Sequence, residues 1–409
     1  MPVALGKQTR RVRFDMVYPF IVIITVFVLL YWVLKINKEY YVLAFFARRA
    51  RATDGRFVDN IAPILKGNTI FGNVFDLCGK DDAGTFRYYR DAALEMGKSY
   101  LIYAFGSPMF NIIDPVNAEF VLSNPTLITK SIDYDFMQPA LHKGLLTSTG
   151  KKWHTRRKMI TPTFKHNVLV QFEEIFRRYV NKKRRFAMLD TLICAEKDGL
   201  IDHAGICEEV NTLMFGGFDP SSITLMFTIF NLSMYEDMQE LCYQEILEHI
   251  HDPNNLDINQ LSNLKYLERF IKETLRIFPP VPIIGRQTSE ETVLPNGLIL
   301  PTGSQIIMHV FDLHRNPKYW DQPDVFDPDR FLPQNSVKRH AYAYIPFSMG
   351  LRNCLAQQYF MILIKTLLCF ILKKFKILPV TNSKDLVFHM GLTLRVENNI
   401  KVKFVLRNK

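Results

Sequence analysis

Cys354 ends a stretch of residue types that suits a metal-binding loop. The stretch reads Phe347-Ser348-Met349-Gly350-Leu351-Arg352-Asn353-Cys354. A thiolate binds iron well from a loop that brings the sulfur close, shields it from water and supplies hydrogen bonds to it. Gly350 permits a tight turn, Phe347 could shield the sulfur, and Arg352 would place a cation against an anionic cofactor group. The alternative is a buried structural cysteine in a loop that enters a helix over residues 357–372.

This stretch resembles the haem-thiolate signature of the cytochrome P450 family, in which the cysteine is the axial ligand of the haem iron. The resemblance implies that Cys354 binds the iron of haem b (iron protoporphyrin IX) and that Phe347, Gly350 and Arg352 contribute to the haem site. Ala356 departs from the pattern, because the family usually has glycine there. Among the branches of the family, the chain otherwise resembles most the one that hydroxylates fatty acids.

Three cations follow the order that this resemblance implies. Trp153 and Arg157 lie one helical turn apart, so that an indole N–H and a guanidinium could reach one haem propionate. Arg286 resembles the position that reaches the other propionate, and Arg352 comes from the cysteine loop. The alternative for Arg157 and for Arg286 is a solvated surface arginine.

Glu273 and Arg276 lie three residues apart and therefore on one face of a helix. Arg330 stands where the family supplies a second arginine to such a pair. A carboxylate between two guanidinium groups can be buried only if its hydrogen bonds are complete, and breaking such a set typically costs about 3–5 kcal/mol. The expected role of this network is to hold the cysteine loop against the helices.

The stretch Gly216-Gly217-Phe218-Asp219-Pro220-Ser221-Ser222 resembles the family's long helix over the haem. There an acid and a threonine manage protons for bound oxygen, which implies a catalytic role for Asp219 with Ser221, because Pro220 replaces the threonine and offers no hydroxyl. The alternative is that Gly216 and Gly217 end one helix and Asp219 caps the next. The fatty-acid branch usually has a glutamate at the position of Gly216, so a covalent haem ester there is excluded.

The segment between Arg157 and Asp219 is shorter than the family requires, because several helices normally lie there, including the pair that roofs the substrate pocket. We therefore expect a mainly α fold with small β-sheets, a cytochrome P450 fold that lacks part of this roof, with an internal deletion near residues 179–186. We also expect one strand over residues 99–113, a helix over 115–122, a mostly helical region over 153–283 and two hairpins, over 290–309 and 392–406.

Residues 16–34 form a run of 19 residues without a charge, of which 13 are Val, Ile, Leu or Phe. Such a run is long enough to cross a bilayer as a helix, and no small-residue cleavage site follows it, so we favour an anchor over a signal peptide. Basic residues flank both ends, so charge does not set the orientation. The predicted organisation is an N-terminal anchor and linker over 1–54 and a catalytic domain over 55–409.

Composition agrees with a membrane-bound intracellular enzyme. Six cysteines without CxxC pairs indicate free thiols in a reducing compartment. The net charge of +11 fits an anionic membrane surface or an acidic protein partner, and the chain has no recognisable nucleic-acid-binding module.

These observations favour a microsomal monooxygenase on the endoplasmic reticulum membrane with its catalytic domain in the cytosol. It would insert one atom of O2 into a lipophilic substrate, such as a fatty acid, terpenoid or xenobiotic, with NADPH electrons delivered by a flavoprotein reductase. One alternative is a haem-thiolate isomerase or dehydratase that does not activate O2. Another is an inactive truncated isoform that remains tethered to the membrane.

Overall fold

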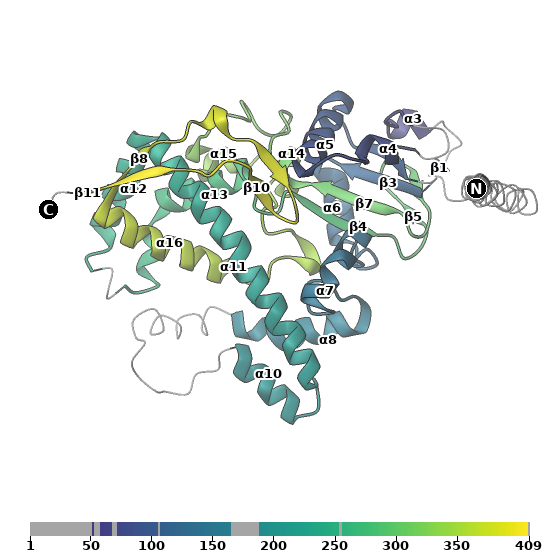
Figure 1. Ribbon diagram of the computed structural model, residues 1–409, viewed down its shortest axis with the longest axis horizontal. Coiled ribbons are helices and arrows are strands. Elements are labelled where there is room, and N and C mark those ends of the chain that lie inside the picture. Colours follow the sequence, from purple (N-terminus) through teal and green to yellow (C-terminus); the bar gives the residue numbers. More distant parts are fainter. Residues whose placement is uncertain are drawn as a thin grey trace, which may run out of the picture.

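The computed structural model describes residues 51–52, 58–67, 72–104, 107–164, 188–252 and 256–407. The predicted anchor helix over residues 16–34 and the predicted deletion near 179–186 lie outside the described residues. In Figure 1, the largest sheet and α5 lie on one side of the molecule and α12, α13 and α16 on the other, with the long helix α11 between them. The expectation of a mainly α fold with small β-sheets is confirmed.

The α-helices have the following bounds: α3 Val58–Ile61, α4 Val74–Leu77, α5 Asp82–Met96, α6 Pro115–Ser123, α7 Gln138–Leu141, α8 Gly150–Ile160, α10 Met188–Lys197, α11 His203–Met234, α12 Glu236–His249, α13 Lys265–Ile277, α14 Val310–Leu313, α15 Pro333–Ser336 and α16 Gln357–Lys374. Short 3-10 helices connect them: η1 Ile132–Met137, η2 Thr161–Phe164, η4 Gln260–Asn263, η5 Pro328–Phe331, η6 Ala341–Ala343, η7 Gly350–Arg352 and η8 Ser383–Asp385.

The largest sheet has the strand order β2-β3-β7-β4, with strands Tyr100–Ala104, Ser107–Ile112, Gln305–His309 and Ile283–Gln287. Only the β3–β7 pair in it is parallel. A second sheet joins β1 (Arg51–Ala52), β6 (Leu298–Leu300) and β5 (Thr292–Val293). The predicted strand over 99–113 is thus two antiparallel strands, whereas the helix predicted over 115–122 is α6, whose N-cap Asp114 accepts the backbone N–H of Asn117.

One predicted hairpin is confirmed and the other is wrong. β5 and β6 pair antiparallel within residues 290–309, as expected. Within 392–406, however, β10 (Leu394–Val396) pairs with β9 (Phe388–Met390), and β11 (Val402–Leu406) pairs with β8 (Phe375–Pro379). β8 follows directly on the last turn of α16, so no turn signal separates it from the helix. The strand pairing is therefore decided by contacts between distant segments and not by the local turn residues.

Helix α11 is continuous through Pro220, so the alternative of a helix break at Gly216 and Gly217 is wrong. Asp202 caps its N-terminus by accepting the backbone N–H of Gly205 at 2.9 Å. By length and composition, α11 is also the one helix of the described ranges that could cross a membrane. Its C-terminal half is nevertheless occupied with core packing, because Phe227 and Phe230 are fully buried.

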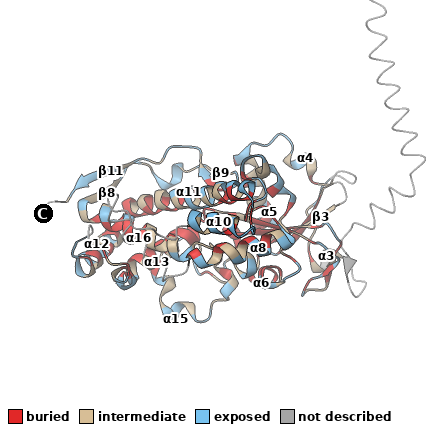
Figure 2. Cartoon of the chain, turned by 90° about the horizontal axis from the view of Figure 1, so that it is seen from below, coloured by how far each residue is buried: buried red, intermediate tan, exposed pale blue. Residues whose placement is uncertain are grey.

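The main core lies where α11 meets α13 and α16. Phe227 of α11 stacks on Phe278 with ring centroids 4.3 Å apart, and Phe270 and Leu368 join the same cluster. Figure 2 shows these helices with buried turns facing inward and exposed residues outside. Tight packing at this crossing fixes α11 relative to α13 and to the segments that follow both helices.

We expect Phe227→Ala to lower the free energy of unfolding by about 3–5 kcal/mol, because the lost ring leaves a cavity in the core. Phe218→Ala is the matched control on the same helix, since Phe218 is 74% exposed, and it should change stability by less than about 0.5 kcal/mol. Urea denaturation followed by circular dichroism measures both. Equal losses in the two variants would contradict this account of the core.

Candidate haem site

The loop that carries Cys354 is held in a tight, specific turn. Gly350 has a φ of +72°, and a Cβ atom added there would overlap the backbone carbonyl of Leu122 in α6. The backbone N–H of Cys354 donates to the carbonyl of Phe347 at 2.8 Å. Gly350 is thus required both for its backbone conformation and for the close approach of α6. The ring of Phe347 packs edge-on against Phe360 of α16, with centroids 5.2 Å apart.

Cys354 retains solvent-accessible surface, although protein atoms crowd its thiol. Burial raises the pKa of the Cys354 thiol, and the backbone N–H of Ala356 and the guanidinium of Arg157 oppose this shift. Both opposing groups favour a thiolate. A metal ion that binds the sulfur replaces its proton outright, so the raised pKa does not prevent ligation.

Arg352 lies across the ring of Trp153, with its guanidinium 4.5 Å from the ring centroid. It donates to the carbonyls of Ile128 at 3.0 Å and Leu145 at 3.2 Å, and also to that of Ser148. Burial, with repulsion from Arg286 and Arg157, lowers the pKa of Arg352 to about 9. Arg352 is therefore held by neutral carbonyl groups in a region of excess positive charge.

The other two predicted cations, Arg286 and Arg157, have different hydrogen-bond partners. Arg286 in β4 is 1% exposed, and its guanidinium donates only to the carbonyl of Gly285, at 2.9 Å. Arg157 in α8 instead donates to the backbone oxygen of Asn353 at 2.9 Å and to its side-chain oxygen at 2.6 Å. Arg157 therefore supports the cysteine loop directly, which the sequence reasoning did not anticipate. The alternative of a fully solvated arginine is wrong for Arg286.

Lys130 is a fourth cation of this region that the sequence reasoning missed. Its Nζ atom lies 4.1 Å from the ring centroid of Tyr134. Burial, with repulsion from Arg286 and Arg352, lowers the pKa of Lys130 well below its ordinary value. The residues on either side of Lys130, Thr129 and Ser131, give no sign that it joins the other cations. It joins them only because η1 packs against β4. Gly285 shows how close that packing is, because a Cβ atom there would overlap the side chain of Ser131.

Within the described ranges, no carboxylate forms an ion pair with Lys130, Arg157, Arg286 or Arg352. Arg286 is fully buried and the other three are partly buried, and cations withdrawn from water in this way are costly without an anionic partner. The two propionates of haem would supply that negative charge, and Cys354 would supply the iron ligand. Within the described part of the chain, no group of three or more His, Cys, Asp or Glu side chains could hold a metal ion. These residues fit haem.

The predicted charge network is present and buried. Arg276 donates to both carboxylate oxygens of Glu273, at 2.7 and 2.8 Å, and neither side chain is exposed. Arg330 approaches the same carboxylate at 3.4 Å, and the backbone N–H of Asp327 donates to it at 2.8 Å. Burial raises the pKa of Glu273, and the contact with Arg276 opposes this shift. Among the described residues, Glu273 is the carboxylate that pairs with Arg276, and it supplies the counter-charge for this buried guanidinium.

The two arginines of this network also bond to the segment 314–325. Arg276 also donates to the carbonyls of His314 at 2.9 Å, Pro323 at 2.7 Å and Val325 at 3.1 Å. Arg330 donates to the carbonyl of Gln322 at 2.8 Å. The two arginines therefore order the segment 314–325, and this segment in turn bonds to Ala343 and Ile345, shortly before the cysteine loop (residues 347–354).

Asp219 is placed in an ion pair on α11. Its carboxylate accepts the hydroxyl of Thr393 at 2.8 Å and pairs with the guanidinium of Arg395 in β10. The hydroxyl of Ser222 donates back to the carbonyl of Phe218 at 2.8 Å, and Ser221 is partly buried. The structure thus joins Asp219 to the C-terminal sheet, whereas it shows no hydrogen bond from Ser221 to Asp219. The adjacent glycines of α11 leave open space, because a Cβ atom at Gly216 or Gly217 would meet nothing within 4 Å.

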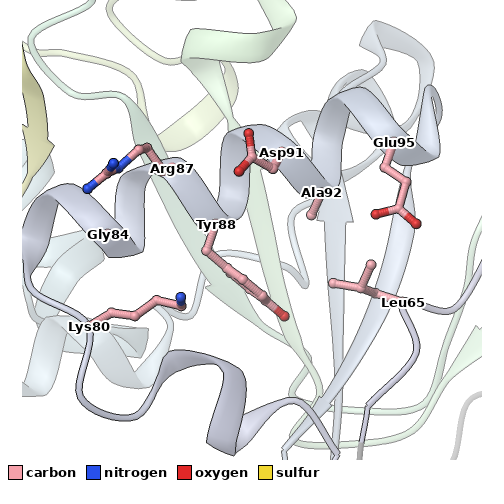
Figure 3. A pocket seen from close by; sticks show the side chains of 8 residues that line it. All are labelled: Leu65, Lys80, Gly84, Arg87, Tyr88, Asp91, Ala92 and Glu95. Carbon is pink, nitrogen blue, oxygen red and sulfur yellow. The ribbon is translucent and has the colours of Figure 1, made fainter.

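A pocket of 370 Å³ lies elsewhere, along α5 (Figure 3). Half of the residues that line it are charged: Leu65, Lys80, Gly84, Arg87, Tyr88, Asp91, Ala92 and Glu95. None of them belongs to the cysteine loop, α8 or α11. We therefore base the candidate site on the donor set around Cys354 and not on this pocket.

Glu273→Gln should lower the free energy of unfolding by about 3–5 kcal/mol, because it leaves Arg276 buried without its anion. Glu236→Gln is the control, since Glu236 forms an exposed ion pair with Lys376 and its loss should cost less than about 1 kcal/mol. Denaturant titration of both variants measures the difference. Equal costs would show that the Glu273 network adds nothing beyond a surface pair.

Comparison with known proteins agrees with the site. The Cytochrome P450 family model matches residues 63–183 and 177–404. "Cytochrome P450 4p1" of Drosophila melanogaster is 45% identical over 500 residues, covering 93% of this chain and 98% of that protein. "Probable cytochrome P450 4p3" of the same organism is 44% identical, with the same coverage, and "Probable cytochrome P450 4ac1" is 35% identical, covering 91% and 96%. The cysteine loop, the buried cations and these matches together establish that the chain belongs to the cytochrome P450 family.

Proposed function

We propose that this cytochrome P450 inserts one atom of O2 into a lipophilic substrate, with electrons from NADPH delivered by a flavoprotein reductase. The family supports haem-dependent monooxygenase activity in general. One observation carries the proposal for this chain. Cys354 lies in the same region as four partly or fully buried cations, and none of the four forms an ion pair with a carboxylate of the described residues: Lys130, Arg157, Arg286 and Arg352. Fatty acids, terpenoids and xenobiotics are the substrate classes that we propose.

Bound haem would supply the activation of oxygen, which a thiolate ligand favours by donating electron density to the iron. The chain's own residues would seat it. Arg286, Arg352 and Lys130 would neutralise the propionates, and the indole N–H of Trp153 has no hydrogen-bond partner among the described residues, so it is free to donate. Arg157 would keep Asn353, and with it Cys354, in place through its two hydrogen bonds.

Proton delivery would depend on Asp219 with Ser221. Asp219 is 8% exposed and begins in an ion pair with Arg395, so it would have to exchange this partner for water or a hydroxyl group. Ser221 is the hydroxyl that follows Pro220 directly in α11. Because Pro220 has no hydroxyl at the usual position, we expect proton transfer to be a weak step of this enzyme.

We propose that an internal deletion near residues 179–186 removes part of the pocket roof. The two matches to the family model adjoin at residues 177–183, and the alignment with the first relative spans 500 positions although the chain has 409 residues. Exposed apolar side chains on the described part support the same proposal, because Met214 is 68% exposed on α11 and Phe136 is 83% exposed in η1. Surfaces of this kind usually face a partner element.

We propose further that residues 16–34 anchor the chain in the endoplasmic reticulum membrane with the catalytic domain in the cytosol. The support is the uncharged length of that run and the overall charge of +11. Removal of residues 1–35 should release the protein from microsomal membranes at alkaline pH. Full retention of the shortened chain would show that another surface binds the membrane.

Cys354→Ala should abolish the thiolate-type band in the reduced carbon-monoxide difference spectrum, because no other thiol is placed to bind the iron. Cys207→Ala is the control, since Cys207 is an exposed thiol on α11, and it should keep the band. Membrane association should be unchanged in both variants. A band that survives in Cys354→Ala would assign the ligand to another residue and overturn the proposal.

Pro220→Thr should raise the yield of oxygenated product per NADPH consumed, because it restores a hydroxyl beside Asp219. The measurement uses the full chain with reductase and compares product with hydrogen peroxide released. Pro220→Val is the control, since valine has the same shape as threonine but no hydroxyl. Equal yields in the two variants would show that proton delivery is not limiting.

A further inference from the structure

His314 lies between Arg276 and Ile345, and the proposed haem-binding residues give it no role. It follows α14 directly and is fully buried. Its backbone carbonyl accepts the guanidinium of Arg276 at 2.9 Å. Its ring accepts the backbone N–H of Ile345 at its Nε2 atom, also at 2.9 Å. One residue thus contacts Arg276 of the Glu273–Arg276 ion pair with its backbone, and with its side chain it contacts Ile345, two residues before the cysteine loop (residues 347–354).

The His314 ring can accept the hydrogen bond from Ile345 in only one protonation state. Nε2 must be unprotonated to accept from Ile345, so the proton of the neutral ring lies on Nδ1. Burial lowers the pKa of His314 to about 3, and the charges of Arg276 and Arg315 act in the same direction. The backbone groups of Arg276 and Leu275 oppose this shift. The imidazole is therefore neutral at neutral pH and its Nε2 lone pair is available.

The contact at Ile345 leads to the thiolate ligand in few steps. The carbonyl of Ile345 accepts the backbone N–H of Ser348 at 3.0 Å, and the carbonyl of Phe347 accepts that of Cys354 at 2.8 Å. Ser348 has a φ of +56°, an unusual conformation for a residue with a side chain, so the turn needs support from its surroundings. A shift of Ile345 would therefore be passed to the position of the sulfur.

Two further contacts hold the same short segment. Tyr344 lies against the His314 ring with centroids 5.2 Å apart, and its hydroxyl donates to the carbonyl of Lys272 in α13 at 2.9 Å. The indole N–H of Trp320 donates to the carbonyl of Ala343 at 3.3 Å. Because the hydrogen bonds of Tyr344 and Trp320 do not involve the imidazole, the loss of the His314 ring should displace the loop without unfolding the domain.

We propose that His314 is a positioning residue for the haem thiolate, because its Nε2 atom fixes the backbone of Ile345 and so transmits the position of the Glu273–Arg276 pair to Cys354. This inference rests on the proposed function, since it assumes that Cys354 binds haem iron. Its structural part, the hydrogen bond to Ile345, can be measured without haem.

The test compares His314→Phe, which keeps an aromatic ring against Tyr344 but removes the acceptor, with His309→Phe. His309 is the matched control, because it is equally buried and bonds to Asn111 at 2.9 Å in the β3–β7 pair, away from the cysteine loop. In the carbon-monoxide spectrum of the full chain, we expect His314→Phe to lower the ratio of the thiolate-type band to the shifted band at least fivefold. His309→Phe should leave this ratio within twofold of the parent.

A second pair of variants serves if His314→Phe does not fold. The carboxamide of His314→Gln extends about as far as Nε2, whereas that of His314→Asn is one bond shorter. Hydrogen exchange of the peptide that contains Ile345, measured on the haem-free chain, should stay near the parent in His314→Gln and become at least tenfold faster in His314→Asn. Equal exchange in both variants would overturn the inference.

The outcomes separate this inference from the proposed function. A parent protein without a thiolate-type band would contradict the proposed function, whatever the exchange data show. A parent with the band, together with a His314→Phe variant that keeps it, would contradict only the role of His314. An equal loss of the band in His309→Phe at matched stability would show that general destabilisation, and not the Ile345 contact, controls the thiolate.

Discussion

The buried ion pair between Glu273 and Arg276 orders the segment 314–325 and, as we propose, sets the position of Cys354 through it. Neither charge could remain inside the protein alone, and both are satisfied by several further hydrogen bonds. The bonds left over on Arg276 go to backbone carbonyls of a segment with little regular structure. The buried guanidinium of Arg276 thus orders a segment that hydrophobic packing alone would leave poorly defined. This segment places His314 and Trp320 against residues 343–345, which precede the cysteine loop.

A second constraint acts on the other side of the thiolate, where positive charges lack partners. Arg286, Arg352 and Lys130 come from a strand, the cysteine loop and the segment before η1. In addition to burial, Arg286 lowers the pKa of Arg352, and both arginines lower the pKa of Lys130. Within the described residues, no carboxylate forms an ion pair with any of the three, so gathering them is costly. Haem has two propionate groups and its own iron, so its binding would neutralise these cations and stabilise the folded protein. The site is in this sense complete only with its cofactor.

The sequence predicts the parts of this arrangement that depend on local spacing. The cysteine loop, the Glu273–Arg276 pair three residues apart and the first hairpin could all be recognised from neighbouring residues. Lys130 and His314 could not, because their roles arise from contacts with Arg286 and Ile345, which are far away in the chain. The pairing of β11 with β8 was missed for the same reason. Arg395, the partner of Asp219, lies in a short strand that no local signal connects with α11.

The continuity of α11 through Pro220 shows how tertiary packing outweighs a local rule. A proline inside a helix removes the hydrogen bond to the carbonyl four residues earlier, here that of Gly216, and costs about 3 kcal/mol. Two features reduce that cost. Gly216 is exposed, so its carbonyl can bond to water, and the residues after Pro220 are fixed by the burial of Phe227 and Phe230. Proline at position 220 therefore has two effects. It provides no hydroxyl, and it leaves the carbonyl of Gly216, three residues before Asp219, without its usual helical donor. Because water bound to this carbonyl would lie near the carboxylate of Asp219, the helix keeps a polar position on the face where we propose that protons are transferred.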